Sequence, residues 1–343
     1  MVSKLHWRIY RYRLPLTQPL RMLGRTLHER VGLLLQLEDD SGNQAEGELA
    51  PLPGVHSETL EECLQQLHAG FAESKWPQLA PALRFGLEMA QWNLREQQGQ
   101  TTPAGPLVML APLPVNGLLM GSAADLVAEC ERLRTAGFQA VKLKLGRESV
   151  ATNVEQVRVV RESLGPEVEL RLDANRAWTL EQAQDFAEQI QGAKIAYCEE
   201  PLQRPEDLPR LHESTGLPLA LDESLWTNPE PSTLSLQGVR AVVLKPGVLG
   251  GWRATSRWVR WARKQQLRVV FTSCFESGLG LAWIARMASA LSHTPTPCGL
   301  DTGKWLVQDL VVPSPKVAGG FLCLPKTPRL CEEVLELLEE GDG

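Results

Sequence analysis

The sequence predicts an α/β protein in which a parallel α/β barrel follows a smaller α+β unit. Strand patterns precede helix patterns over roughly the first hundred residues, and strands and helices then alternate over about 200 residues. No GxGxxG string opens a helix after the first strand, which disfavours the competing doubly wound sheet. A chain of 343 residues is long enough for both parts.

The N-terminal unit begins with strands and ends with helices. A capping pattern with Ser57 and Glu61 predicts a helix that runs to about His68, and helical apolar spacing predicts a second over Pro81–Gln97. Alternating or apolar runs predict an antiparallel meander of three strands at Leu5–Pro15, Val31–Glu38 and Gln44–Leu49.

A Pro-rich hinge, Thr102–Leu113, leads into the alternating part. The expected strands are Ala140–Leu145, Val168–Asp173, Ile195–Glu199, Pro218–Asp222, Ala241–Leu244, Arg268–Thr272 and Gly299–Asp301. The expected helices are Ala123–Thr135, Thr152–Leu164, Thr179–Gln191, Pro205–Ser214, a short one near Pro231–Leu236, Trp252–Lys264 and Leu279–Leu291. A last helix, Pro328–Glu340, is expected to pack back on the N-terminal unit. The expected division is therefore 1–105 with 316–343 for the capping part and 106–315 for the barrel.

Composition and charge exclude several classes of function. A net charge of -6 and a pI near 5.7 argue against a nucleic-acid surface or an anionic membrane partner. No apolar run is long enough to span a bilayer, and charges interrupt the N-terminus where a signal peptide would be apolar. Seven scattered cysteines without a CxxC pair suit reduced thiols. We expect a cytoplasmic protein, a monomer or small homo-oligomer, that acts on a small molecule.

Charged residues end five successive predicted strands. Chemistry in a parallel α/β barrel lies at the C-terminal ends of its strands. Residues two apart on a strand point to the same side, so each pair from one strand should face the barrel mouth together. These positions hold Lys142 and Lys144, Arg171 and Asp173, Glu199, Asp222, and Lys245.

Three of these residues are carboxylates on adjacent strands. Asp173, Glu199 and Asp222 would form an oxygen-only site without His or Cys, which favours Mg²⁺ with Mn²⁺ as a substitute. The flanking lysines would face each other across it, with the amine of Lys144 available as a base. The pattern predicts metal-assisted proton abstraction next to a carboxylate.

Six strings along the chain resemble the successive signatures of the enolase superfamily, in its muconate-lactonizing subgroup. They are VKLKLG (141–146), RLDANRAW (171–178), CEEPL (198–202), LDESL (221–225), VLKPGVLGG (243–251) and FTSCFESGLGLA (271–282). The resemblance implies a modified TIM barrel, (β/α)7β, with an α+β capping domain. It also implies Asp173, Glu199 and Asp222 as the metal ligands, with Lys144 and Lys245 as the catalytic residues on opposite faces.

Within that subgroup the chain resembles the o-succinylbenzoate synthases of proteobacteria. The signals are ELAPLPG (48–54) before a Ser-Glu-Thr helix start, RLDANRAW, and GLDT (299–302). The resemblance implies a lyase that performs the syn dehydration of 2-succinyl-6-hydroxy-2,4-cyclohexadiene-1-carboxylate in menaquinone biosynthesis, through an enediolate intermediate.

That resemblance also assigns roles to individual residues. Lys144 would take the proton and then help hydroxide leave, while Lys245 would stabilise the intermediate through a cation–π contact. The remaining residues expected to bind substrate are Lys142, Arg171, Asn175, Ser273 and Ser277, with backbone N–H groups at the start of helix 279–291 around the succinyl carboxylate. The cap loop, expected at Thr17–Leu27, carries no informative pattern.

Two alternatives stay open. A dipeptide epimerase or N-acylamino-acid racemase would use the same lysines and metal, but such enzymes usually carry an Asp-x-Asp pair near the last strand. The chain has Leu300-Asp301-Thr302 there, which favours the synthase. A catalytically silent barrel would show a lost ligand or lysine, and none is missing.

Overall fold

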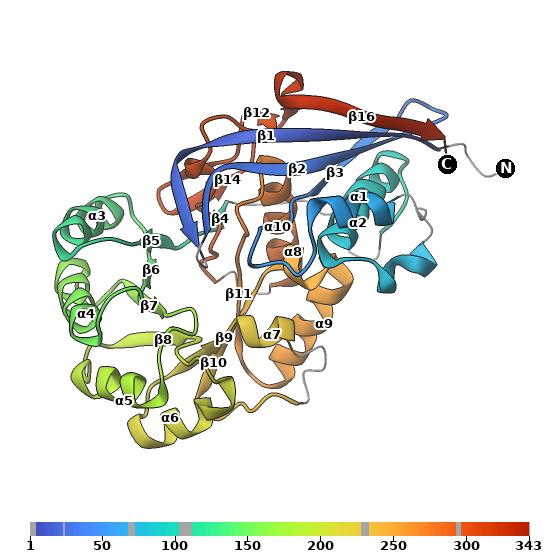
Figure 1. Cartoon of the computed structure of the whole chain (residues 1–343). Helices are drawn as coiled ribbons and strands as arrows, with labels where there is room; N and C mark the ends of the chain where they lie inside the picture. The colour runs from blue at the N-terminus through green and yellow to red at the C-terminus, as the bar shows by residue number, and fades with distance from the viewer. Residues whose placement is uncertain are drawn as a thin grey trace.

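The computed structural model describes residues 5–22, 25–67, 73–102, 112–227, 233–292 and 296–342. A curled sheet of seven parallel strands is wrapped by helices, and a four-stranded antiparallel sheet with two helices lies above it in Figure 1. Across these ranges, no helix has both the length and the apolar character that a bilayer crossing needs.

The parallel strands follow one another around the barrel in chain order. They are β5 (Gly117–Leu119), β6 (Ala140–Lys144), β7 (Glu169–Asp173), β8 (Ile195–Glu199), β9 (Leu219–Leu221), β10 (Val239–Leu244) and β11 (Arg268–Phe271). Parallel bridges from Cys298 to Val115 and from Gly299 to Thr272 join the two ends of the sheet. The segment at 298–299 is thus the eighth strand, and the predicted (β/α)7β barrel is confirmed.

Helices cover the outer side of the barrel (Figure 1). They are α3 (Ala123–Thr135), α4 (Val150–Leu164), α5 (Leu180–Gln189), α6 (Leu208–Thr215), α9 (Gly251–Lys264) and α10 (Gly278–Leu291). Two short helices, α7 (Glu223–Thr227) and α8 (Pro246–Leu249), follow directly on the C-terminal ends of β9 and β10. None of the helices expected from the sequence corresponds to α7 or α8. The helix expected near 231–236 and the hinge at 102–113 lie partly outside the described residues.

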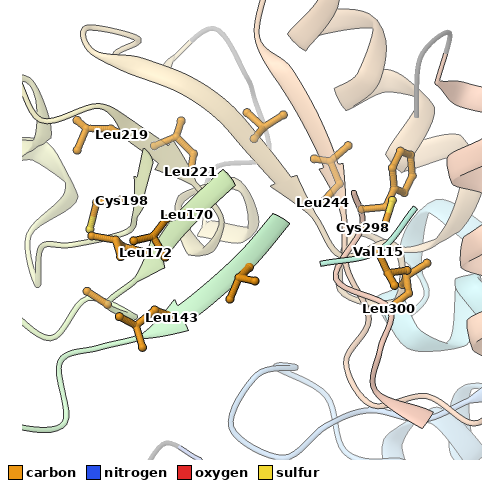
Figure 2. Close-up of a cluster of buried hydrophobic side chains, with 14 of the residues drawn as sticks. Val115, Leu143, Leu170, Leu172, Cys198, Leu219, Leu221, Leu244, Cys298 and Leu300 are labelled. Atoms are coloured by element: carbon orange, nitrogen blue, oxygen red, sulfur yellow. The ribbon is translucent and has the colours of Figure 1, made fainter. Parts of the chain in front are cut away.

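Strand residues alternate between an apolar outer layer and a polar interior. Figure 2 shows part of the outer cluster, in which Leu143, Leu172, Cys198 and Leu221 come from successive strands. The intervening residues turn inward and include the lysines and carboxylates of the strand ends. This period-two pattern fixes the register, because a slip of one residue would bury the charges against the helices.

The capping domain is built on β1 (Leu5–Met22), β2 (Arg25–Asp39) and β3 (Gln44–Leu49), with α1 (Leu60–Leu67) and α2 (Pro81–Gln97). Most of the loop expected at Thr17–Leu27 is instead a continuation of the β1–β2 hairpin. The cap of α1 is also shifted: Glu62 accepts hydrogen bonds from the backbone N–H and hydroxyl of Thr59, at 2.7 and 3.1 Å. Thr59 and Glu62 therefore form the capping pair, rather than Ser57 and Glu61.

The helix expected at Pro328–Glu340 is wrong. The segment forms β15 (Arg329–Leu330), a 3-10 turn at Glu332–Val334 and β16 (Leu335–Asp342), and β16 pairs antiparallel with β1. Oε2 of Glu340 on β16 lies 3.5 Å from Nε of Arg8 on β1, so acidic side chains of β16 lie beside basic side chains of β1. This tertiary pairing overrides the helix propensity of the Leu- and Glu-rich segment.

Four short strands lie outside these two sheets, one before the first barrel strand and three after the last barrel helix. They are β4 (Leu113–Pro114), β12 (Val311–Val312), β13 (Lys316–Ala318) and β14 (Phe321–Cys323), with β12 paired to β15 and the sheet order β13-β14-β4.

Candidate active site

Three carboxylates stand at the ends of three neighbouring barrel strands. Asp173 is in register with Glu199, and Glu199 is in register with Ala220, two residues before Asp222. All three carboxylates are fully buried. The structure therefore gathers the three candidate ligands at one end of the barrel, from strands β7, β8 and β9.

Three lysines contact these carboxylates. Lys142 Nζ lies 2.8 Å from Asp173 Oδ2 and 3.2 Å from Glu199 Oε2, so it bridges two of them. Lys144 Nζ donates to Asp173 Oδ2 at 2.5 Å, and Lys245 Nζ donates to Asp222 Oδ2. Because β7, β8 and β9 separate β6 from β10 in the sheet, Lys144 and Lys245 flank the carboxylates from opposite sides.

The pKa values of the three carboxylates are shifted in different directions by their surroundings. Burial would raise the pKa of Asp173, but Lys142 and Lys144 outweigh it and hold that pKa well below its usual range. Burial, together with the charge of Asp173, raises the pKa of Glu199 well above its ordinary value. Burial also raises the pKa of Asp222 to about 6, although Lys245 opposes it. An additional positive charge would thus stabilise the ionised forms of Glu199 and Asp222.

The donor set suits a hard divalent cation. Across the described residues, no three Asp, Glu, His or Cys groups already converge as metal ligands, and Lys142 bridges Asp173 and Glu199 instead. However, Oδ1 of Asp222 is buried without a hydrogen-bond partner in the same described part of the chain. An oxygen-only set with an unpartnered buried oxygen fits Mg²⁺ or Mn²⁺.

A cavity of about 1020 Å³ opens over these groups. Its floor includes Lys142, Lys144 and Lys245, and the capping domain contributes part of its walls. Asn175 lines it, accepting from Lys144 at 2.8 Å. Ser273 also lines it and shares a 2.7 Å hydrogen bond with the hydroxyl of Thr302. The capping residues on its walls are Leu20, Arg25, Thr26, Leu52, Gly54 and Val55.

Arg171 does not reach this cavity. It points into the barrel on the same side as Asp173, but it is fully buried one layer deeper. There it donates to Glu169 at 2.6 Å and to the carbonyl of Pro297 at 2.7 Å, and it lies against the ring of Tyr197. The expectation that Arg171 binds substrate did not allow for the two-residue step down the strand, about 6.6 Å.

Ser277 is also placed differently from the expectation. It is the N-cap of α10, and its hydroxyl donates to the buried carboxylate of Glu48 at 2.6 Å. The backbone N–H groups of Ser277 and Gly280 donate to Glu48 as well, and that of Gly278 donates to Asp309. Because protein carboxylates occupy this helix start, it cannot also hold a substrate carboxylate.

Two features of the site gave no signal in the sequence. Trp226 of α7 lies with its ring 4.4 Å from Lys245 Nζ and lines the cavity. Glu200 is fully buried with a φ of 39°, and its carboxylate accepts from the backbone N–H groups of Asp222 and Ser224. Such strain in a residue other than glycine persists only where its surroundings hold it. Glu200 thus orders the turn that carries Asp222.

Family comparisons cover most of the chain. A model of the family described as "Enolase C-terminal domain-like" matches residues 125–336, and a model of the "MenC, N-terminal domain" matches residues 5–94. An o-succinylbenzoate synthase of Klebsiella pneumoniae is 34% identical over 317 residues, which are 90% of this chain and 94% of the relative. One of Vibrio cholerae is 33% identical over 310 residues, 87% and 89% of the two chains.

Solved structures share the fold at lower identity. An L-Ala-D/L-Glu epimerase of Bacillus subtilis has a TM-score of 0.81 at 20% identity, covering 98% of both chains. A dipeptide epimerase of Cytophaga hutchinsonii, complexed with Mg and a dipeptide, has a TM-score of 0.82 at 20% identity over 100% of both chains. A muconate lactonizing enzyme of Pseudomonas fluorescens has a TM-score of 0.77 at 20% identity, covering 97% and 98%. These likenesses establish the architecture and not the reaction.

Proposed function

We propose that this chain, which belongs to the enolase superfamily, is an o-succinylbenzoate synthase of menaquinone biosynthesis. It would convert 2-succinyl-6-hydroxy-2,4-cyclohexadiene-1-carboxylate to 2-succinylbenzoate and water. The observation that carries the proposal is the placement of Lys144 and Lys245 on opposite sides of three buried carboxylates, in a chain 34% identical to a relative of that name. A cytoplasmic location is part of the same proposal.

The reaction needs one base on one face of the substrate. Lys144, as the free amine, accepts the proton on the carbon next to the ring carboxylate. Hydroxide then leaves from the neighbouring carbon on the same face and takes that proton, which gives water and the aromatic ring. The syn course suits a single residue that serves both steps, and Lys144 approaches from one side only.

Lys245 has a different role in this scheme. Its ammonium is held between the Asp222 carboxylate and the ring of Trp226, with the ring 4.4 Å from Nζ. Fixed there, it would face the intermediate from the side opposite Lys144 and stabilise its negative charge. It would not need to exchange a proton during dehydration.

Asp173, Glu199 and Asp222 would hold the divalent ion, Mg²⁺ with Mn²⁺ as a substitute. When bound, it supplies Lewis-acid stabilisation of the negative charge that develops on the substrate carboxylate. Lys142, which bridges Asp173 and Glu199, would keep the two carboxylates close together.

The second candidate is an epimerase or racemase, which several structural neighbours are. A substrate with a free ammonium group would need an unpaired acid near the last barrel strand. The acid present there, Asp301, is paired with Lys304 Nζ at 2.6 Å, and its side chain is only 10% exposed. This pairing supports the dehydratase.

One paired assay tests the proposal. The Mg²⁺-loaded protein is given the cyclohexadiene substrate, with appearance of the aromatic product followed by absorbance, and in parallel a panel of dipeptides and N-acyl amino acids in deuterated buffer. Dehydration with a kcat/KM at least about a hundredfold above any epimerisation is the expected result. Epimerisation without dehydration would refute it.

A further inference from the structure

Two segments far apart in the chain form facing parts of the cavity wall. One follows β3 in the capping domain, and the other precedes α10 in the barrel. Leu52 and Cys274, one from each segment, belong to the same small apolar cluster. The lining residues are Leu52, Gly54 and Val55 from the first segment and Ser273, Cys274 and Phe275 from the second. The width of the cavity at this edge therefore depends on how the capping domain is held against the barrel.

Arg30 of β2 joins the backbones of the two segments directly. Its Nε donates to the carbonyl of Phe275 at 3.0 Å, and its Nη2 donates to the carbonyl of Ala50 at 2.7 Å. The residue is only 2% exposed. A guanidinium has donors in a fixed planar arrangement, so one side chain can hold both carbonyls at a set separation.

Glu48 makes a second link, from the end of β3 to the start of α10. Its carboxylate accepts from the backbone N–H of Ser277 at 2.9 Å and of Gly280 at 2.8 Å, and from the hydroxyl of Ser277 at 2.6 Å. Tyr12 of β1 donates to the same carboxylate at 2.5 Å. A negative charge at this helix N-terminus is favoured by the helix dipole as well.

The glycines of α10 fit this interpretation. A Cβ on Gly280 would lie 2.6 Å from Oε2 of Glu48, and a Cβ on Gly278 would lie 2.5 Å from Oδ2 of Asp309. The Gly278-Leu279-Gly280 string is therefore explained by two carboxylates that approach the helix backbone. The ELAPLPG string (48–54) supplies one of them, together with the wall residues that follow it.

We propose that Arg30 and Glu48 are positioning residues that set the separation of the two wall segments and so determine how tightly the cavity holds its substrate. They touch neither the lysines nor the three carboxylates in any hydrogen bond of the described structure, so they act through the walls. The kinetic part of this inference rests on the proposed function, whereas the structural part does not.

The test compares Arg30→Lys and Glu48→Gln with a matched control, Glu88→Gln. Glu88 is another buried capping-domain carboxylate at the start of a barrel helix, where it accepts from the backbone N–H of Trp252 in α9, but it does not line the cavity. We expect KM for the cyclohexadiene substrate to rise about tenfold in Arg30→Lys and Glu48→Gln, with kcat within about threefold of wild type. Glu88→Gln should leave both parameters unchanged.

Hydrogen exchange of the substrate-free, Mg²⁺-loaded protein gives the second measurement. Amides of 50–56 and 273–280 should exchange at least about tenfold faster in Arg30→Lys and Glu48→Gln, and those at the start of α9 only in Glu88→Gln. Unchanged exchange in both wall segments would overturn the proposal, as would equal KM values in all three variants. If wild type does not dehydrate the substrate, the proposed function fails, and exchange alone still decides whether Arg30 and Glu48 hold the walls.

Discussion

Glu199 and Glu200 are neighbours in sequence, but exchanging each for glutamine should have distinguishable effects on turnover, the Mg²⁺ response and stability. Glu199 faces the barrel interior beside Asp173 and is a proposed metal ligand, whereas Glu200 orders the turn behind Asp222. Glu199→Gln should abolish turnover and the stabilisation by Mg²⁺. Glu200→Gln should keep both in reduced form and lower the stability of the protein itself.

The magnitude for Glu200 follows from its hydrogen bonds. Oε1 accepts from the N–H groups of Asp222 and Ser224 at 2.9 and 2.6 Å, which an amide oxygen can still do. Oε2 accepts from the Ser224 hydroxyl at 3.0 Å and from Arg176 Nε at 3.2 Å. An amide NH2 at that position can use the hydroxyl but opposes the guanidinium, so one charge-assisted bond is lost, about 1.5–3 kcal/mol. Loosening a residue that supports a proposed ligand should cost about 10–100-fold in metal affinity or activity.

Thermal unfolding with and without Mg²⁺ separates the two residues. When the Mg²⁺ concentration is about 100 times the Kd of the protein tested, Mg²⁺ should raise the free energy of unfolding by about 2.7 kcal/mol, both in wild type and in Glu200→Gln. Glu199→Gln should gain almost nothing at the wild-type Mg²⁺ concentration. If Glu199→Gln keeps the Mg²⁺ response and Glu200→Gln loses it, the residue that faces the metal has been misassigned by one position.

Four further predictions concern the metal, Lys144, Lys245 and the docking of the capping domain. Dialysis against EDTA should abolish dehydration and Mg²⁺ or Mn²⁺ should restore it; full activity in excess EDTA would contradict the metal assignment. Lys144→Ala should stop both dehydration and exchange of the substrate α-proton with deuterium, and Lys144→Arg should not restore either, because a guanidinium does not accept a proton at neutral pH. Lys245→Arg should retain more dehydration than Lys245→Ala, since a cation suffices there; equal activity of the two would argue against that role. Burial raises the pKa of Glu88 to about 7, from 4.5 in the unfolded chain, so the folded state holds a proton that the unfolded state has lost, and stability falls as pH rises between these values. The fall should be about 3 kcal/mol larger in wild type than in Glu88→Gln, measured by urea unfolding from pH 4.5 to 8.

The barrel and its candidate ligands could be predicted because the sequence patterns that indicate them lie within single strands and helices. Each charged residue ends an apolar strand, and parallel strands bring such ends to one rim whatever the connecting helices do. Asp173, Glu199 and Asp222 meet for that reason alone. Arg171 is not part of this rim, because it lies two positions earlier on the strand and shares the direction of Asp173 but not its depth.

The capping domain could not be predicted in the same way. The fate of the C-terminal segment depends on the free edge of β1, more than 300 residues earlier in the chain (Tyr12 pairs with Leu335 and His6 with Asp342). Residues 17–22 and 25–27 of the expected loop belong to β1 and β2, because each half of the hairpin provides the partner of the other. Local helix and strand propensities predict neither the pairing of β16 with β1 nor the length of the β1–β2 hairpin.

The N-terminus of α10 depends both on its local sequence, which makes it a site for an anion, and on the tertiary fold, which determines the anion that it binds. A helix that starts after a barrel strand, with Ser277 as its N-cap, has the geometry of an anion site, and its sequence gives no reason to doubt that use. Only the fold reveals that Glu48, 229 residues away, already occupies it. The positive end of the α10 dipole thus binds a carboxylate of the capping domain rather than a carboxylate of the substrate. The second carboxylate of the proposed substrate must then be recognised elsewhere in the cavity, and variation in the capping domain can change that recognition without changing the lysines and carboxylates of the barrel.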